Sequence, residues 1–170
     1  LVAEVQACRR CPTMEGRRRV LSCANGPLEA RVLFVAEAPG RLGGDRTGIP
    51  LTSDQTGRNF ARLLVEAGLR REEVFVTNAV LCNPRTPDGR NRAPSRTERA
   101  SCLEHLRLVL ELVRAPVVVS LGAVALAQLD AIAPHGLSLR DVAQPAAWRD
   151  RVLFPLYHPG PRAQIHRPFA

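Results

Sequence analysis

The chain has 170 residues, 45% of them hydrophobic, which is enough to form one domain with a hydrophobic core over residues 1–170. It carries 24 basic residues, all of them arginine, against 16 acidic residues, and its net charge is +8. The lack of lysine excludes a side-chain Schiff base with a carbonyl substrate. No apolar run reaches the roughly 20 residues that cross a bilayer, so we expect no membrane span. The chain begins without Met and stops just after HRPFA, which suits a segment trimmed at its ends.

Strand-like and helix-like segments alternate along the chain. Apolar runs that end in turn residues predict strands, and apolar residues at helical spacing predict helices. In chain order we expect a strand at 31–36, a helix at 56–68, a strand at 74–80, a helix from 95 to about 113, a strand at 116–121, a helix at 122–130 and a strand at 152–157. Gly68 is expected to end the first helix, and Ser95 with Glu98 predicts a capping box that opens the second.

This alternation predicts an α/β fold with a mostly parallel sheet and helices on both faces. In such sheets, ligands bind beyond the carboxyl ends of the strands. The unusual polar motifs of this chain all follow strands: AEAPG after the first, TNAVLCNP at the end of the second, LG after the third and YHPGP after the fourth. We therefore expect these four motifs to meet at one edge of the sheet.

Cysteine usage indicates the compartment. The chain has five cysteines, and Cys8 and Cys11 form a CxxC motif. An odd number with a single CxxC argues against the disulfide framework of a secreted protein. We therefore expect a protein of the reducing cytoplasm that holds a bound metal or cluster.

Arginines gather in two stretches, residues 17–19 and positions 85, 90, 92, 96 and 99. Guanidinium groups pair with phosphates through two parallel hydrogen bonds, so such a surface suits a polyanion. A compositional bias of the source organism is the alternative explanation for the total excess of arginine, although it explains the local clusters less well.

Taken in order, CRRCP, AEAPG with the following GDRTG, TNAVLC and YHPGPRA resemble the motifs of the uracil-DNA glycosylase superfamily, in its iron–sulfur branch called families 4 and 5. The resemblance covers nearly the whole chain. It implies a three-layer α/β/α sandwich around a four-stranded parallel sheet. It also implies a monofunctional enzyme of base-excision repair that hydrolyses the N-glycosidic bond of uracil in DNA and leaves an abasic site.

The resemblance has implications for partners as well. Uracil-containing DNA, single- or double-stranded, is the expected substrate of a monomer associated with the nucleoid, and a sliding clamp is a further partner to consider. Cleavage of the strand by β-elimination is not expected, because that route normally needs a lysine amine.

In the resemblance, Cys8, Cys11, Cys82 and Cys102 correspond to the four thiolate ligands of a [4Fe–4S] cluster. Thiolates are the ligands that such clusters need, and a CxxC turn lets two sulfurs face one cluster. A structural zinc site built from the same four residues is the alternative. Cys23 is left over and is interpreted as a buried or free thiol.

Residues Ala38, Pro39 and Gly40 belong to a small-residue turn that, in the resemblance, lets backbone amides approach the flipped base. Asp45 lines up with the acid that positions water, because cleavage passes through an oxocarbenium-like sugar that a carboxylate stabilises. Glu37 is the second carboxylate candidate. The alternatives are a turn residue of a glycine-rich loop for the first acid and a cap of the loop backbone for the second.

Asn78 stands where these enzymes read the Watson–Crick edge of the base, because an amide offers both a donor and an acceptor to uracil. His158 corresponds to the donor to the charge that develops on O2 as the base leaves. Hydrogen bonds to local backbone are the alternative for both. The resemblance places Gly160, Pro161 and Arg162 in a stiff loop that enters the minor groove, where Arg162 would fill the gap left by the flipped nucleotide.

One departure from the family concerns base stacking. Leu51 stands where the family has a phenylalanine that stacks on the base, and Phe60 and Tyr157 are the candidate substitutes. The remaining histidines, His105, His135 and His166, have no such context and are expected at the surface.

Three other functions compete with uracil excision. The nearest is a broader glycosylase for deaminated purines such as hypoxanthine or xanthine. The second is a non-catalytic or covalently trapping binder of uracil-DNA, although the stretch between Gly40 and Gly48 lacks the histidine that trapping relatives carry. The third is a nucleotide-binding α/β domain, which is disfavoured because no strand leads into GxGxxG or GxxxxGK[ST].

Overall fold

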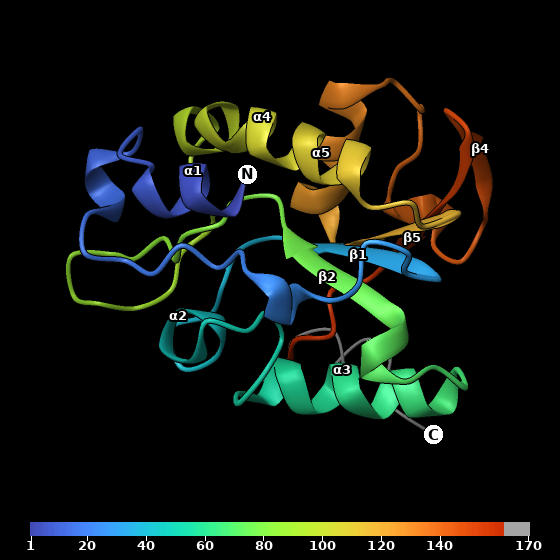
Figure 1. The fold of residues 1–170 in the computed structure, drawn as a ribbon, viewed down its shortest axis with the longest axis horizontal. Coiled ribbons are helices and arrows are strands. Elements are labelled where there is room, and N and C mark those ends of the chain that lie inside the picture. The colour runs from blue at the N-terminus through green and yellow to red at the C-terminus, as the bar shows by residue number, and fades with distance from the viewer. Residues whose placement is uncertain (162–170) are drawn as a thin grey trace.

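A five-stranded sheet in the strand order β2-β1-β3-β5-β4 forms the centre of the protein (Figure 1). The structure is a computed structural model, and it describes residues 1–161. The strands are β1 (Val32–Ala36), β2 (Val74–Asn78), β3 (Val117–Leu121), β4 (Ala146–Trp148) and β5 (Arg151–Leu156). The pairs β1–β2, β1–β3 and β3–β5 are parallel, so the mixed α/β fold and the mostly parallel sheet are confirmed.

The expectation of a four-stranded sheet is corrected by the short strand β4, which pairs antiparallel with β5. Its register places Trp148 opposite Arg151, so only the turn residues Arg149 and Asp150 separate the two strands. Arg149 adopts a left-handed conformation with φ 55°, which permits this tight turn. A three-residue edge strand has too few residues to show the alternation by which strands are identified in a sequence.

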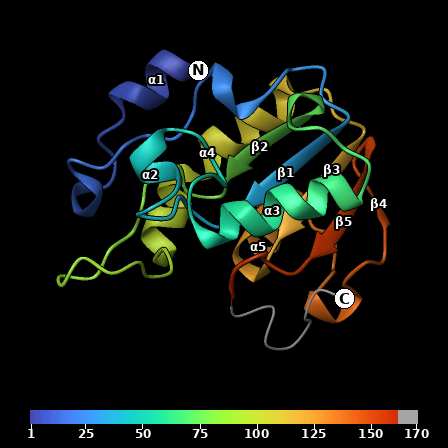
Figure 2. The same ribbon diagram turned by 90° about the horizontal axis from the view of Figure 1, so that it is seen from below.

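Helices cover both faces of the sheet (Figures 1 and 2). They are α1 (Val2–Ala7), α2 (Gly44–Thr47), α3 (Gln55–Glu66), α4 (Arg96–Leu112) and α5 (Ala123–Ile132), and the 3₁₀ turns are η1 (Pro12–Met14), η2 (Cys23–Asn25), η3 (Arg71–Glu73) and η4 (Leu139–Asp141). The three helices predicted from the sequence correspond to α3, α4 and α5. The two short helices, α1 and α2, were not predicted, because six and four residues are too few for helical periodicity. Among the described residues, no helix is long and apolar enough to span a membrane.

The predicted helix ends are confirmed. Ser95 is the N-cap of α4, and its side chain and that of Glu98 form a reciprocal capping box. Gly68 follows the C-cap of α3 with φ 66°, and the amides of Gly68 and Leu69 donate to Val65 O and Leu64 O. This pair of bonds closes the helix in the left-handed geometry that favours glycine.

Two apolar clusters hold the layers together. On one face, Leu33 and Val35 of β1 pack with residues of α1, α4 and α5, including Leu106 and Leu129. On the other face, Phe34 of β1 packs with residues of α3, and its ring lies edge-on to that of Phe60 at 5.1 Å between centroids. Successive side chains of β1 therefore point to opposite faces of the sheet, as in any β-strand.

The strand order contains one reversal of direction. The chain passes from β1 to β2 on one side, then crosses to β3 on the other side of β1, and continues outward to β5. The connections that leave β1 and β3 therefore run to opposite sides. In open α/β sheets such a reversal opens a crevice at the carboxyl ends of the strands.

The side chains of two histidines expected at the surface are buried. His105 lies inside the α1–α4 contact with 2% exposure, and neither of its ring nitrogens has a hydrogen-bond partner among the described residues. The ring of His135 bonds Leu126 O through Nε2 and accepts the amide of Leu137 at Nδ1. His166 lies outside the described residues.

Candidate active site

A cavity of about 520 Å³ opens at the carboxyl edge of the sheet. Its walls come from the segments that follow four different strands, as expected from the positions of the polar motifs. The residues that line it include Glu37, Ala38, Pro39, Gly40, Leu51, Asp54, Asn78, Asn83, Asn91, Gly122, Tyr157, His158 and Gly160. The structure therefore brings together most of the residues that the sequence assigned to catalysis and base binding.

Asn78 supplies a buried polar side chain to the cavity. It is the last residue of β2, lies opposite Ala36 of β1 and is 1% exposed. Its Nδ2 is buried and has no hydrogen-bond partner among residues 1–161. A buried amide donor without a partner costs free energy, so this group is suited to bind a ligand in the cavity.

Glu37 directly follows β1 and is half-buried at the same wall. Its backbone carbonyl accepts the amide of Val80, which ties the turn after β1 to the end of β2. Burial raises the pKa of the Glu37 carboxyl, and the charge of Arg99 acts against this shift. A carboxyl group with a raised pKa beside a cavity is a candidate for proton exchange or for orienting water.

His158 enters the cavity from the segment after β5. Its Nδ1 accepts the amide of Gly160 at 3.1 Å, so in the neutral ring the proton is on Nε2. Burial lowers the pKa of His158, and the charge of Asp54 acts against this shift. Burial therefore favours the neutral imidazole, whose single N–H is on Nε2.

Two contacts hold the His158 loop in place. The Asn59 side chain of α3 donates from Nδ2 to Pro159 O at 2.7 Å. Gly122 has a φ of 94°, and a Cβ at this position would lie 3.2 Å from the Cβ of His158. Glycine therefore satisfies both a left-handed backbone and a close approach at this point.

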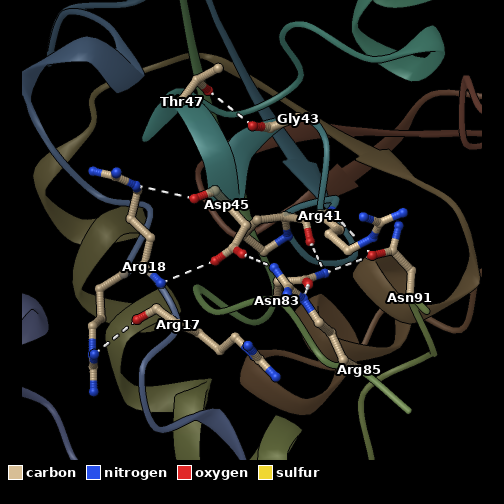
Figure 3. A network of polar contacts seen from close by, with 11 residues as sticks. Arg17, Arg18, Arg41, Gly43, Asp45, Thr47, Asn83, Arg85 and Asn91 are labelled. Carbon is tan, nitrogen blue, oxygen red and sulfur yellow. Dashed lines mark hydrogen bonds and ion pairs between the residues drawn. The ribbon is translucent and has the colours of Figure 1, made fainter. Parts of the chain in front are cut away.

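Asp45, the predicted water-positioning acid, is not among the residues that line this cavity. Figure 3 shows the polar contacts that its carboxylate makes instead. The short helix α2 carries its carboxylate towards two other segments of the chain. Oδ1 accepts the backbone amide of Arg18 at 3.0 Å, and Oδ2 forms an ion pair with Arg85. Both oxygens are thus engaged, and the side chain is only 9% exposed.

Asp54 lines the cavity, although the sequence analysis did not select it. Its Oδ1 caps α3 by accepting the amide of Gly57 at 2.8 Å. Its Oδ2 lies so close to the glycine turn that a Cβ at Gly40 would approach it to 2.6 Å. The helix begins at Gln55, one residue before the predicted start, and aspartate is a typical N-cap, so Asp54 could have been identified from the sequence as the residue that opens this helix.

The positions of Phe60 and Tyr157 show which of these two aromatic residues can stack on a base in the cavity. Leu51 lines the cavity with a left-handed backbone, φ 52°. Phe60 is not at this wall, because its ring packs against Phe34 in the core. Tyr157 does line the cavity and is 40% exposed.

The loop assigned to the minor groove is described only in part. Gly160 is buried and lines the cavity, whereas Pro161 is exposed and is not among the lining residues. Arg162 lies outside the described residues.

The four cysteines assigned to a cluster converge around a separate small cavity of about 20 Å³. Its lining includes Cys8, Cys11, Cys82 and Cys102, together with Arg10, Met14, Arg19, Val80 and Ser101. Burial raises the pKa of Cys82 to about 11 and that of Cys102 to about 12, as expected for thiols in a poorly solvated space. Cys23 is exposed and takes no part in this group.

Several arginines of the predicted polyanion surface have internal partners, which corrects that interpretation in part. Arg85 pairs with Asp45, and Arg92 binds the Glu98 carboxylate through two nitrogens. Arg19 donates twice to the backbone oxygen of Cys8. Arg18, Arg90 and Arg96 are exposed, although Arg90 also pairs with Asp88 and Arg18 donates from Nε to Asp45 O.

Comparison with known proteins relates this geometry to a family. Residues 23–169 match the family model of the uracil DNA glycosylase superfamily. The chain is 38% identical to the type-4 uracil-DNA glycosylase of Thermotoga maritima over 122 residues, which are 72% of this chain and 60% of that protein. It is 34% identical to the type-4 enzyme of Archaeoglobus fulgidus, over 74% of this chain and 59% of that protein.

A type-5 enzyme is also similar over a longer stretch. The chain is 33% identical to the type-5 uracil-DNA glycosylase of Thermus thermophilus over 190 residues, which cover 95% of this chain and 81% of that protein. By contrast, the chain spans only about 60% of the length of the two type-4 relatives.

Proposed function

Because the chain belongs to the uracil-DNA glycosylase superfamily, we propose that it removes uracil from DNA by hydrolysing the N-glycosidic bond, which leaves an abasic site. One observation carries this proposal. A single cavity at the strand ends gathers an amide, an imidazole and a carboxylate, those of Asn78, His158 and Glu37. These are the groups that recognition of a flipped base, departure of its anion and attack by water require.

We assign base recognition to Asn78. Its unpartnered Nδ2 supplies a donor for a uracil carbonyl, and its Oδ1 supplies an acceptor for the N3–H of the base. Ala38, Pro39 and Gly40 would face the flipped nucleotide from the turn after β1, and Leu51 and Tyr157 would cover the base. Tyr157 is the aromatic residue at this wall that can stack on it.

His158 would donate from Nε2 to O2 of the base as negative charge develops there. The amide of Gly160 occupies Nδ1 and so directs the proton to Nε2. A neutral donor suits this step, because it stabilises the leaving anion by a hydrogen bond without delivering a proton to it.

Glu37 is our choice for the carboxylate that orients water and stabilises the cationic sugar. It lines the cavity, and its carboxylate is free of hydrogen bonds from residues 1–161. Asp45 is tied to Arg18 and Arg85, and Asp54 uses one oxygen as a helix cap. The water-positioning role predicted for Asp45 is therefore transferred to Glu37.

We propose that Cys8, Cys11, Cys82 and Cys102 hold a [4Fe–4S] cluster. The four thiols surround one space, and Arg10 and Arg19 beside them would offset the negative charge of bound thiolates. Among the described residues, no three or more His, Cys, Asp or Glu side chains are placed to hold a single metal ion. A structural zinc site from the same four thiols stays the alternative, and iron and zinc analysis of the purified protein distinguishes the two.

The cluster would supply iron–thiolate bonds that join the N-terminal segment to the segment after β2 and to α4. No step of glycosidic cleavage needs it in this proposal.

DNA binding would use the exposed arginines for phosphates, with Gly160, Pro161 and Arg162 as the loop that approaches the minor groove. We propose action as a monomer, since one chain supplies every group named above, and action on the chromosome in a reducing cytoplasm, where thiolates stay available to iron. The helices on both faces of the sheet support the α/β/α layering of the family.

The test is a single-turnover assay on an end-labelled duplex that contains one uracil. We expect free uracil and an alkali-labile site, with no nick before alkali, because no lysine is available for β-elimination. Asn78→Ala and Glu37→Ala should each lower the rate about a hundredfold, whereas Asp150→Asn, at the opposite end of the sheet, should not. Failure of the wild-type chain to release uracil would contradict the proposal.

The same assay separates the alternatives, which the relatives' names do not favour. Faster release of hypoxanthine or xanthine than of uracil would indicate the broader glycosylase. A DNA–protein band that survives denaturation would indicate the trapping binder.

A further inference from the structure

We propose that Asp45 is a positioning residue, which holds the Pro39–Arg41 turn of the cavity in place through Arg85 and Asn83. The inference rests on the proposed function, because the turn is assigned there to the flipped base. It replaces a direct role at the reacting atoms with an indirect one. Three segments far apart in the sequence meet in this network (Figure 3).

The first step of the network is the anchoring of Asp45. Arg18 donates its amide to Oδ1 and its Nε to the backbone oxygen of Asp45 at 3.1 Å. Arg85 pairs with Oδ2, and its side chain is only 20% exposed. Asp45 therefore joins the N-terminal segment, helix α2 and the loop that follows β2.

The second step is the transfer from Arg85 to Asn83. The guanidinium uses its terminal nitrogen for Asp45 and its Nε for Asn83 Oδ1, at 2.5 Å. Arginine suits this position because its donors have a fixed planar geometry, so binding one acceptor orients the donor to the other. Lysine has a single charged nitrogen and cannot hold both acceptors in this arrangement.

The third step fixes the cavity wall. Since Arg85 occupies the amide oxygen of Asn83, the Nδ2 group must face the other way, where it donates to Pro39 O at 2.6 Å and to Asn91 Oδ1 at 3.0 Å. The same Asn91 oxygen accepts the amide of Arg41 at 3.0 Å. Hydrogen bonds therefore hold the turn at Pro39 and at Arg41, the residues on either side of Gly40.

Burial of Asn83 restricts the rotation of its side-chain amide. Asn83 is 1% exposed, so an amide that rotated away would leave buried polar atoms without partners. Asn83 also directly follows Cys82 in the chain, so this hydrogen-bond network lies next to the cysteine group. Loss of the Asp45 charge would release Arg85 first, and Asn83 would then lose the contact that sets its orientation.

The experiment is a double-mutant cycle with Asp45→Asn, Asn83→Ala and the double variant. Asp150→Asn is the matched control, because it removes a similar carboxylate beside Arg151 at the other end of the sheet. We expect each single variant to lower kcat on uracil-DNA about tenfold with little change in KM, since misplacement of a bound group acts on the chemical step. If Asp45 acts through Asn83, the double variant should also lose about tenfold rather than the product of the two effects.

Hydrogen exchange supplies a readout that does not depend on catalysis. Amides of residues 37–46 should exchange at least about tenfold faster in Asp45→Asn and Asn83→Ala than in the wild type or in Asp150→Asn. Arg85→Lys is the milder second variant if a member of the cycle fails to fold, and it should show the same faster exchange.

Two results would overturn the inference. A double variant with about a hundredfold loss would mean that Asp45 acts independently of Asn83. Unchanged exchange in the single variants would mean that the network does not hold the turn. If the wild-type chain releases no uracil, the proposed function fails, and the exchange measurements still decide whether Asp45 positions the turn.

Discussion

The hydrogen bond from Asn59 to Pro159 O offers a direct test of how the His158 loop is held. Asn59 is 4% exposed on α3, and its Nδ2 reaches the carbonyl at 2.7 Å. The substitution Asn59→Ala removes this donor and leaves Pro159 O buried without its partner. The loop that carries the imidazole would lose its link to the helix.

The size of the effect follows from two opposing contributions. An unsatisfied buried carbonyl costs about 1–3 kcal/mol. Alanine is a better helix former than asparagine, which returns up to about 0.7 kcal/mol. We therefore expect a net loss of about 1–2 kcal/mol in the free energy of unfolding, or a melting temperature about 2–8 °C lower for a chain of this size.

Thermal melting and single-turnover release of uracil are the assays. The rate should fall about tenfold, because a less constrained imidazole spends less time at the departing base. Val65→Ala is the control: Val65 lies on the same helix and is 77% exposed, so this change introduces alanine into α3 without removing a hydrogen-bonding side chain. An Asn59→Ala protein that melts and reacts like Val65→Ala would refute the reasoning.

Three further predictions concern the pH dependence, the cysteines and a glycine. Burial raises the pKa of Glu37, so activity should fall as pH drops through that raised value, and the residual activity of Glu37→Gln should lack this acid limb. Cys102→Ala should purify with less iron than wild type and melt at a lower temperature, whereas Cys23→Ala should do neither. Gly122→Ala should lower the free energy of unfolding by about 1–2 kcal/mol, because the backbone at this position is left-handed, and thermal melting checks this loss. The added Cβ should also displace His158 and slow uracil release, which a pH–rate profile of the variant checks.

The sequence predicted the parts of the fold that local patterns determine. The apolar runs at β1, β2, β3 and β5 and the capping box of Ser95 and Glu98 are properties of neighbouring residues, so their positions follow from short windows of sequence. The convergence of the motifs followed from one further rule, the common edge at which parallel strands end.

Side-chain destinations could not be predicted in the same way. Asp45 and Glu37 both follow β1 in a glycine-rich stretch, and only the turn of α2 sends one towards Arg85 and leaves the other in the cavity. The partners of Arg85 and Arg92 are likewise set by the path of the loop after β2. His105 shows the same difficulty, because its burial depends on the position of α1, a helix too short to predict.

The reversal of strand order beside β1 means that the opening at the sheet edge is created by the routing of the backbone, before any side chain is chosen. Of the residues that line it, Ala38, Leu51 and Leu139 pack only at the margins of the two apolar clusters. An exposed lining residue such as Tyr157 can therefore be exchanged at small cost to folding, whereas the buried Asn83 cannot, and the range of bases accepted can change through such positions while the scaffold persists.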